Sequence, residues 1–291
     1  MRKFISEILL LIVTIIWGLA FVWQSIASKH LGPLTVVGFR SGIAVIFLFL
    51  VVLIFPFLYK SQEPKFGVVK SKSRSIILSI SCGLALFFAM YIQQIGLAYT
   101  TASKAGFITV LYICIVPLMG LILGHKINKY FLIGLILSVV GLYLLSIKGD
   151  FTLEYGDLLV LISAILFALH IIVIDYAVTK VNAMYLSIGQ LIVVSVLSLS
   201  IAAFKEGYVL SNIMEVLPSL IALGVLSSGV AYTLQIIAQR NIPAHTASLI
   251  MSLESVVAAI GGVIILGEIL STREVIGMVV VFVGIIISQK K

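Results

Sequence analysis

The fold is decided by the first long apolar stretch of the chain, which reads ISEILLLIVTIIWGLAFVWQSIA at residues 5–27. A helix needs about 20 mostly apolar residues to cross a bilayer, and this stretch provides them. It is longer than the core of a signal peptide, about 7–15 residues, so we expect it to be retained as the first helix. Nine similar stretches follow, at residues 33–58, 75–97, 103–124, 128–147, 155–178, 183–204, 214–238, 244–266 and 272–289. We therefore predict an all-α integral membrane protein with ten transmembrane helices.

The composition agrees with a chain whose solvent is mostly lipid. Hydrophobic residues make up 62% of the sequence and charged residues 10%, with a mean hydropathy of +1.26. A soluble domain carries roughly 25% charged residues, so a water-soluble globule is excluded. The net charge is +8, but the basic residues lie between apolar stretches and form no basic stripe. The partners expected from this pattern are the lipid bilayer and a small-molecule substrate, with no nucleic acid.

The distribution of Lys and Arg predicts the orientation in the membrane. If the N-terminus is inside, 13 of the 19 basic residues face the cytoplasm, five face the opposite side, and Arg40 lies within a helix. Cytoplasmic connections of membrane proteins carry this positive excess. We therefore expect a multi-pass protein of the cytoplasmic membrane with both termini in the cytoplasm.

The two halves of the chain repeat one another. After a shift of 150 residues Trp17 aligns with Phe167 and Arg40 with Gln190, and after a shift of 141 YIQQ at 91–94 aligns with YTLQ at 232–235. A shift of 143 aligns the glycines of the fifth and tenth stretches. Each unit, residues 1–149 and 150–291, would hold five helices, an odd number, so the units are expected to be inverted. Inverted repeats with a site near the midplane are typical of secondary transporters.

Several short stretches carry a resemblance to a known family. They are IWGLAFV at 16–22, GFR at 38–40, GLAYTTASKAGFI at 96–108, VPL at 116–118, GDLL at 156–159, SLESV at 252–256 and LGE at 266–268. With these stretches in order over nearly the whole chain, the sequence resembles the EamA-type permeases of the drug/metabolite transporter superfamily, which contain two tandem units. The resemblance implies a ten-helix permease, and many such permeases export amino acids or related metabolites.

Glu254 is an acidic residue near the middle of the ninth expected helix. A bare carboxylate at that depth is costly, so the group must be protonated, paired or beside a water-filled cavity. Two interpretations stay open. Either Glu254 binds a substrate ammonium group or exchanges a proton during transport, or its protonated carboxyl hydrogen-bonds a neighbouring carbonyl and holds two helices together.

Four further residues inside the expected helices have two interpretations each. His170 either relays protons or contacts a substrate carboxylate, or it packs as a satisfied histidine. Arg40 either binds an anionic group or reaches toward lipid headgroups. Trp17 and Tyr112 either stack against the substrate or belong to the core.

Matched polar faces occur on the third and eighth expected helices. Tyr91 and Gln94 lie three residues apart, as do Tyr232 and Gln235. Such faces either line a pathway or form hydrogen bonds between helices. The predicted substrate-binding residues are therefore Trp17, Arg40, Tyr91, Gln94, Tyr112, His170, Tyr232, Gln235 and Glu254, with Glu254 and His170 as the candidates for proton coupling.

The motifs of rival classes are missing from the sequence. We find no zinc helix of the H-E-x-x-H type, no paired aspartates of an intramembrane protease, and no loop that could house a nucleotide-driven domain. Cys82 and Cys114 each lie in an apolar stretch and form no ligand cluster. We therefore predict a non-enzyme that needs no cofactor and no metal.

The predicted function is secondary transport. Alternating access would move a small organic metabolite such as an amino acid out of the cell, either by facilitated transport or driven by an ion or proton gradient. A channel-like or structural membrane subunit is the alternative, although channels usually line their pores with rings of charge or with carbonyl groups.

Overall fold

The computed structural model describes residues 2–61, 72–100, 102–122, 124, 127–146, 154–208, 210–266, 271–288 and 290. The helices of the first half are α1 (Arg2–Ser28), α2 (Pro33–Ile54), α3 (Pro56–Ser61), α4 (Lys72–Leu97), α5 (Ala102–Val110), α6 (Tyr112–Ile122) and α7 (Lys129–Ser146). Those of the second half are α8 (Tyr155–Ala177), α9 (Ala183–Lys205), α10 (Leu210–Glu215), α11 (Leu217–Ala222), the π-helix η1 (Leu223–Ala231), α12 (Tyr232–Gln239), α13 (Ala244–Met251), α14 (Glu254–Leu266) and α15 (Thr272–Ser288). Every regular element within these residues is helical, which confirms the all-α prediction.

Seven helical segments of the described chain are long and apolar enough to cross a membrane. They are Lys3–Ser28, Pro33–Ile54, Lys72–Leu97, Lys104–Ile122, Tyr155–Ala177, Ala183–Lys205 and Leu217–Gln239. The other three predicted stretches are also helical, but α7 and α15 have only 18 and 17 residues, and the third is divided between α13 and α14. Because a helix satisfies its own backbone hydrogen bonds, this is the architecture that a multi-pass membrane protein requires.

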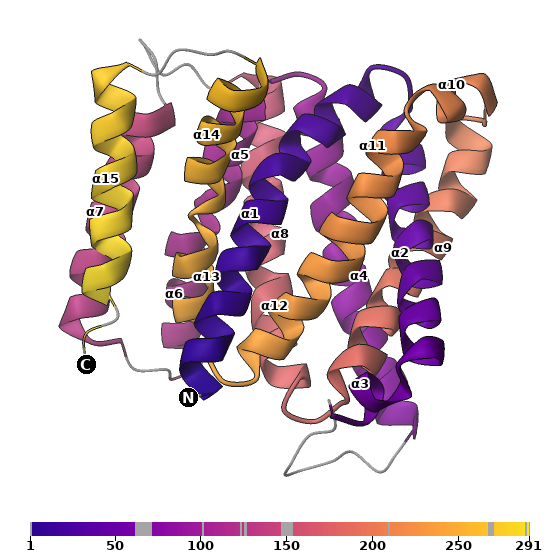
Figure 1. Cartoon of the computed structure of the whole chain (residues 1–291), viewed down its shortest axis with the longest axis horizontal. Helices are drawn as coiled ribbons and strands as arrows, with labels where there is room; N and C mark the ends of the chain where they lie inside the picture. Colours follow the sequence, from indigo (N-terminus) through magenta and orange to yellow (C-terminus); the bar gives the residue numbers. More distant parts are fainter. Residues whose placement is uncertain are drawn as a thin grey trace.

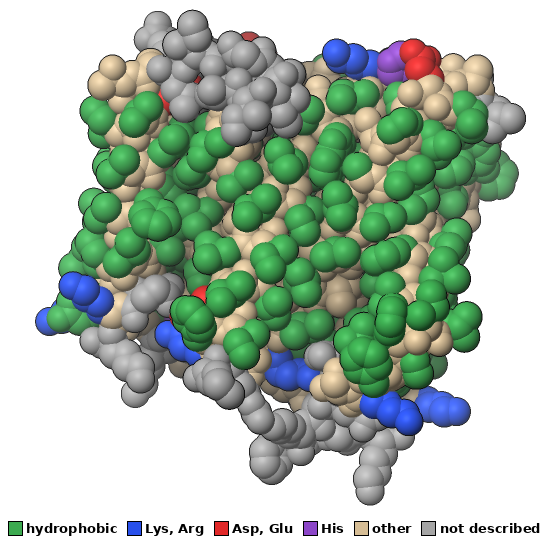
Figure 2. Space-filling view, in the orientation of Figure 1, with side chains coloured by type: hydrophobic (Ala, Val, Ile, Leu, Met, Phe, Trp, Pro, Cys, Tyr) green, Lys and Arg blue, Asp and Glu red, His purple; other side chains and the backbone are tan. Residues whose placement is uncertain are grey.

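The outer surface of the bundle is apolar between two charged edges. Figure 2 shows hydrophobic side chains over the middle of one face, with most charged side chains near its upper and lower margins. On α2 the large side chains of Ile46, Phe49 and Leu53 are exposed, Leu53 by 77%. Such exposure is unfavourable in water and is expected where lipid covers the helix.

The helices form one bundle with a separate pair at its edge (Figure 1). In the main bundle α4 packs against α8 and α9, α2 packs against α9 and η1, and α1 packs against η1, α12 and α14. The pair at the edge consists of α7 and α15. Figure 1 marks both ends of the chain at the same end of the bundle.

Glycines allow α7 and α15 to approach closely. A Cβ atom added to Gly134 would lie 2.4 Å from the carbonyl oxygen of Gly284, and one added to Gly141 would lie 2.7 Å from that of Gly277. Small residues at such a crossing bring two backbones together, which is how membrane helices gain packing contacts where lipid offers no hydrophobic driving force.

The ends of α2 and α9 are joined by two reciprocal contacts. The carboxylate of Glu206, which follows α9, accepts hydrogen bonds from the backbone N–H groups of Leu34 and Thr35 at the start of α2, at 2.9 and 2.8 Å. At the opposite end Asn182 caps the start of α9, and its side-chain amide donates to the carbonyl oxygen of Tyr59 in α3. The two helices therefore run antiparallel, each with its first turn capped.

Two of the predicted stretches are interrupted near their middle. α5 ends at Val110 and α6 begins at Tyr112, while α13 ends at Met251 and α14 begins at Glu254. The backbone at both interruptions forms hydrogen bonds three residues apart, from Leu111 to Ile108 and from Leu253 to Ile250. These tighter turns redirect the helix axis, and both lie beside the cavity described next.

Candidate functional site

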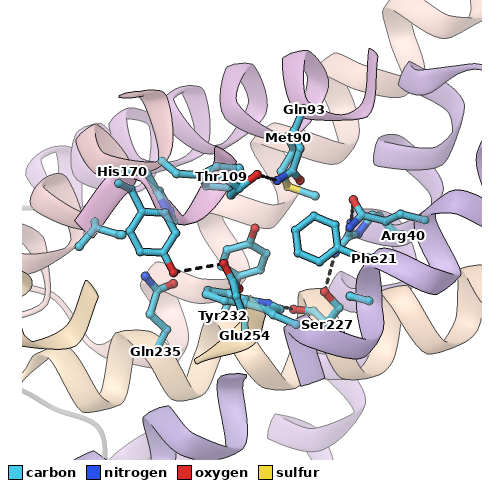
Figure 3. Close-up of a pocket in the computed structure, with 16 residues that line it drawn as sticks. Phe21, Arg40, Met90, Gln93, Thr109, His170, Ser227, Tyr232, Gln235 and Glu254 are labelled. Atoms are coloured by element: carbon cyan, nitrogen blue, oxygen red, sulfur yellow. Dashed lines mark hydrogen bonds between the residues drawn. The ribbon is translucent and has the colours of Figure 1, made fainter. Parts of the chain in front are cut away.

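A cavity lies inside the main bundle, and the empty space in and around it, including the part open to the outside, is about 520 Å³. Seven of the nine residues predicted to bind substrate line it: Trp17, Arg40, Tyr112, His170, Tyr232, Gln235 and Glu254. Its other lining residues are Ala20, Phe21, Gln24, Met90, Gln93, Thr109, Phe167, Ile171 and Ser227. Figure 3 shows Arg40 beside Ser227 and Phe21 toward one end, with Glu254 beside Tyr232 and Gln235 farther along.

Glu254 is buried in the cavity wall at the first residue of α14, with 3% of its surface exposed. The hydroxyl of Tyr112, the first residue of α6, donates a hydrogen bond to Glu254 Oε1 at 3.2 Å. The exposed N–H groups at the start of a helix favour a negative charge there, so the interruption before α14 gives the carboxylate a favourable position. No cation pairs with Glu254 among the residues that the structure describes.

Arg40 is buried at the other end of the cavity, with 4% of its surface exposed. Its Nε donates to Ser228 Oγ at 2.9 Å, Nη1 donates to Gln24 Oε1 at 3.1 Å, and Nη2 donates to Ser227 Oγ at 2.6 Å. All three acceptors are neutral. Within the described part of the chain the guanidinium therefore has hydrogen bonds but no carboxylate to balance its charge, which makes this end of the cavity attractive to an anion.

The π-helix η1 supplies two of these acceptors. Ser227 and Ser228 are consecutive residues of η1 and both face Arg40. The carbonyl oxygen of Ser227 also accepts a hydrogen bond from Trp17 Nε1 at 3.2 Å. A π-helix is rare and has wider turns than an α-helix, and it is found frequently at functional sites. In this protein, Arg40 from α2 and Trp17 from α1 both form hydrogen bonds with the same turn of η1.

Aromatic rings and His170 also line the cavity. The rings of Trp17 and Tyr232 lie 4.9 Å apart between centroids, and the imidazole of His170 meets Tyr232 edge-on at 5.9 Å. His170 Nε2 lies 2.9 Å from Gln190 Oε1, inside hydrogen-bonding distance. His170 is therefore held by a neutral partner, in agreement with a packed histidine as well as with one that contacts a solute.

Tyr91 and Gln94 lie outside the cavity. The ring of Tyr91 stacks on Phe87 with centroids 5.9 Å apart, and Gln94 Nε2 donates to Ser28 Oγ at 2.5 Å. The neighbouring Gln93 lines the cavity instead, and its amide donates to Thr109 Oγ1 at 2.9 Å. Of the two adjacent glutamines of α4, the structure therefore places Gln93 at the cavity and Gln94 outside it.

Several lining residues were not singled out by sequence reasoning, among them Gln24, Gln93, Thr109 and Ser227. They are uncharged polar residues, which are common in membrane helices and give no separate signal. Among the described residues, no three His, Cys, Asp or Glu side chains gather as metal ligands would.

Comparisons with known proteins match this description. A transporter of Archaeoglobus fulgidus described as uncharacterized is 30% identical over 287 residues, which covers 98% of this chain and 86% of that protein. The threonine/homoserine exporter RhtA of Escherichia coli is 29% identical over 150 residues, half of each chain. A solved crystal structure with 13% identity superposes with a TM-score of 0.78 and covers 98% of this chain and 96% of the other, so the two share a fold.

The family match extends over both halves of the chain. The EamA-like transporter family is matched at residues 4–147 and again at 154–289. Glu254, Tyr112, Arg40 and Trp17 all lie within these two segments. A multi-pass helical bundle, an internal cavity that contains Arg40 and Glu254, and this double match together give one conclusion: the chain belongs to the EamA-like transporter family.

Proposed function

We propose that this protein is a secondary transporter that exports a small amino-acid-like metabolite through the cavity between its two halves. One observation carries the proposal: a buried guanidinium, that of Arg40, and a buried carboxyl group, that of Glu254, line the same cavity inside a membrane protein. Buried charges in a bilayer are expensive, so their presence indicates a polar solute. The name of the relative that matches over half of its chain and half of this one, a threonine/homoserine exporter, supports an amino acid as the solute.

We also propose that residues 1–149 and 150–291 form inverted five-helix units, with ten membrane crossings in all. The antiparallel α2 and α9, the interruptions before Tyr112 and Glu254, and the glycine contact of α7 with α15 support this arrangement. Two inverted units have two equivalent conformations, one open to each side, which is the basis of alternating access. The excess of Lys and Arg supports placing both termini in the cytoplasm.

A proton gradient is the driving force in this proposal. Glu254 is the first candidate to carry the proton because its carboxyl can bind and release one inside the cavity, and Tyr112 can follow the change by donating or releasing a hydrogen bond. His170 is the second candidate. Its hydrogen bond to neutral Gln190 leaves it without a charged partner among the described residues.

The test is counterflow in proteoliposomes made from the purified protein. Vesicles loaded with an unlabelled amino acid are diluted into the labelled one, for a panel of amino acids and simple amines, with and without a pH gradient. Transient accumulation of one solute class establishes a carrier and names that class. Uptake that runs downhill without any counterflow would favour a channel, and no movement of any panel member through verified, folded protein would contradict the proposal.

A further inference from the structure

We propose that the cavity binds its solute as a zwitterion, with the solute carboxylate on Arg40 and the solute ammonium group on Glu254 and Gln235. The inference rests on the proposed function, because it takes the cavity as the transport site. The inference goes further by assigning each charged group of the solute to one end of the cavity. It therefore also states that solutes with only one of the two groups bind poorly.

Arg40 has the donors that a carboxylate needs. A guanidinium carries five N–H groups, and three of those of Arg40 are used by Ser228, Gln24 and Ser227. Each terminal nitrogen therefore keeps one N–H with no acceptor in the described part of the chain. The acceptors in place are neutral, so they orient the side chain without neutralising it. A solute carboxylate would supply both the missing acceptors and the missing charge.

The other end of the cavity has the acceptors that an ammonium group needs. The carboxylate of Glu254 receives one hydrogen bond, from Tyr112, and has capacity for more. Gln235, with only 1% of its surface exposed, also lines the cavity, and its Oε1 has no hydrogen-bond partner among the described groups. Two acceptor groups at one end, a carboxyl and an amide oxygen, match the N–H groups of an ammonium ion.

The two ends are kept apart and do not neutralise each other. Arg40 and Glu254 share no ion pair, and Figure 3 shows them at separate positions along the cavity. The rings of Trp17 and Tyr232 lie in the wall of the same cavity. A zwitterion placed along this wall would set its carboxylate against the guanidinium and its ammonium group against the Glu254 carboxyl in its ionised form, whereas an anion or a cation alone would meet only one of the two groups.

The first test uses the wild-type protein and three matched probes. Labelled threonine is counterflowed against unlabelled threonine, against β-hydroxybutyrate, which is threonine without its amino group, and against isopropanolamine, which is threonine without its carboxylate. We expect threonine to compete at about tenfold to a hundredfold lower concentration than either analogue, since each loses a charge-assisted interaction. Equal competition by all three would overturn the inference and needs no variant to be interpreted.

The second test crosses two variants with the same probes. In Arg40→Gln, the concentration of threonine needed for competition should rise to that of isopropanolamine. The concentration of isopropanolamine needed for competition should change by less than about twofold. In Glu254→Gln, the concentration of threonine needed for competition should rise to that of β-hydroxybutyrate. The concentration of β-hydroxybutyrate needed for competition should again change by less than about twofold. The matched controls are Lys129→Gln and Glu7→Gln, which remove one charge each outside the cavity and should leave all three probes as in wild type.

The outcomes separate this inference from the proposed function. If threonine is carried but Arg40→Gln weakens isopropanolamine as much as threonine, the carboxylate does not lie on Arg40 and the inference fails while the transporter stands. The corresponding loss of β-hydroxybutyrate in Glu254→Gln would remove the ammonium assignment. If no amino acid of the panel is carried by wild-type protein, the proposed function itself fails. Should another amino acid replace threonine as the best probe, its own amine-less and carboxyl-less analogues are used.

Discussion

The hydroxyl of Tyr112 donates a hydrogen bond to Oε1 of Glu254 over 3.2 Å, and each of the two residues is the first of a half-helix. They lie 142 residues apart, between the shifts of 141 and 143 residues that align the later stretches of the two halves. The half-helix start favours negative charge at Glu254, and Tyr112 adds a donor from the other half. The polar centre of the cavity is therefore built where the two interrupted stretches meet.

Removing the Tyr112 hydroxyl should impair transport more than folding. In Tyr112→Phe the ring still fills its place, but the Glu254 carboxyl loses the hydrogen bond from the hydroxyl and is no longer held in one orientation. We expect the counterflow rate to fall about fivefold to thirtyfold, which corresponds to one hydrogen bond of about 1–2 kcal/mol. The control is Tyr143→Phe, on the exposed side of α7. A folded Tyr112→Phe protein with wild-type rates would show that the contact has no part in transport.

Replacing Glu254 by glutamine should uncouple transport from protons. An amide of nearly the same shape cannot bind and release a proton, so Glu254→Gln should lose accumulation driven by a pH gradient. Its remaining counterflow should be the same with and without the gradient. The comparison variant is His170→Gln, which tests the second candidate in the same vesicles. If His170→Gln loses the gradient response and Glu254→Gln keeps it, the proton is carried by His170 instead.

The helical stretches of this fold could be predicted because lipid imposes a long apolar run on each crossing. The interruptions could not. Residues 103–124 are as apolar across Leu111 as elsewhere, so hydropathy shows no break there, and the polar residues around Leu253 do not by themselves indicate where a helix ends. A local signal exists only in the second stretch, where the hydroxyls of Ser252 and Ser255 bond to carbonyl groups three residues back and compete with the helix ladder.

The site was predicted best where a residue was expensive to bury. Glu254 and Arg40 are charged, so each required a reason, and both line the cavity. The sequence pattern predicts Gln94, whereas its neighbour Gln93 lines the cavity, because successive residues point about 100° apart and an apolar helix does not reveal its inner face. The partners of Arg40 were out of reach for a different reason. Ser227 lies 187 residues from Arg40 in the sequence, on a π-helix that cannot be predicted from amino-acid composition.

The cap on α2 can be tested with a double-mutant cycle. A Cβ on Gly32 would lie 2.3 Å from the carboxyl carbon of Glu206, although φ at Gly32 is −66°, which alanine adopts without strain. Gly32→Ala should therefore lower the melting temperature in the wild-type background by displacing the carboxylate from the N–H groups of Leu34 and Thr35. Glu206→Ala alone should cost about 1 kcal/mol, as loss of a helix cap does.

In the Glu206→Ala background there is no carboxylate left to displace. Adding Gly32→Ala should then change the melting temperature by little, so the two substitutions should not be additive. The measurement is thermal unfolding of all four proteins in the same detergent. Fully additive losses would mean that the alanine acts on something other than the cap.

The contact between α7 and α15 should tolerate no side chain larger than hydrogen at Gly134. A Cβ there would lie 2.4 Å from the carbonyl oxygen of Gly284, a backbone atom that cannot rotate away, so Gly134→Val must push the two helices apart. Because lipid is as apolar as the helices, no hydrophobic gain draws the separated helices back together. We expect a lower melting temperature and less monodisperse protein on size exclusion in detergent. Gly284→Val should behave alike, since its Cβ would meet the Gly134 carbonyl oxygen at 2.7 Å.

The control is Val140→Leu, which enlarges an exposed side chain of α7 and should behave as wild type. If Gly134→Val melts with the wild type, the close approach of these helices is not what holds the pair together.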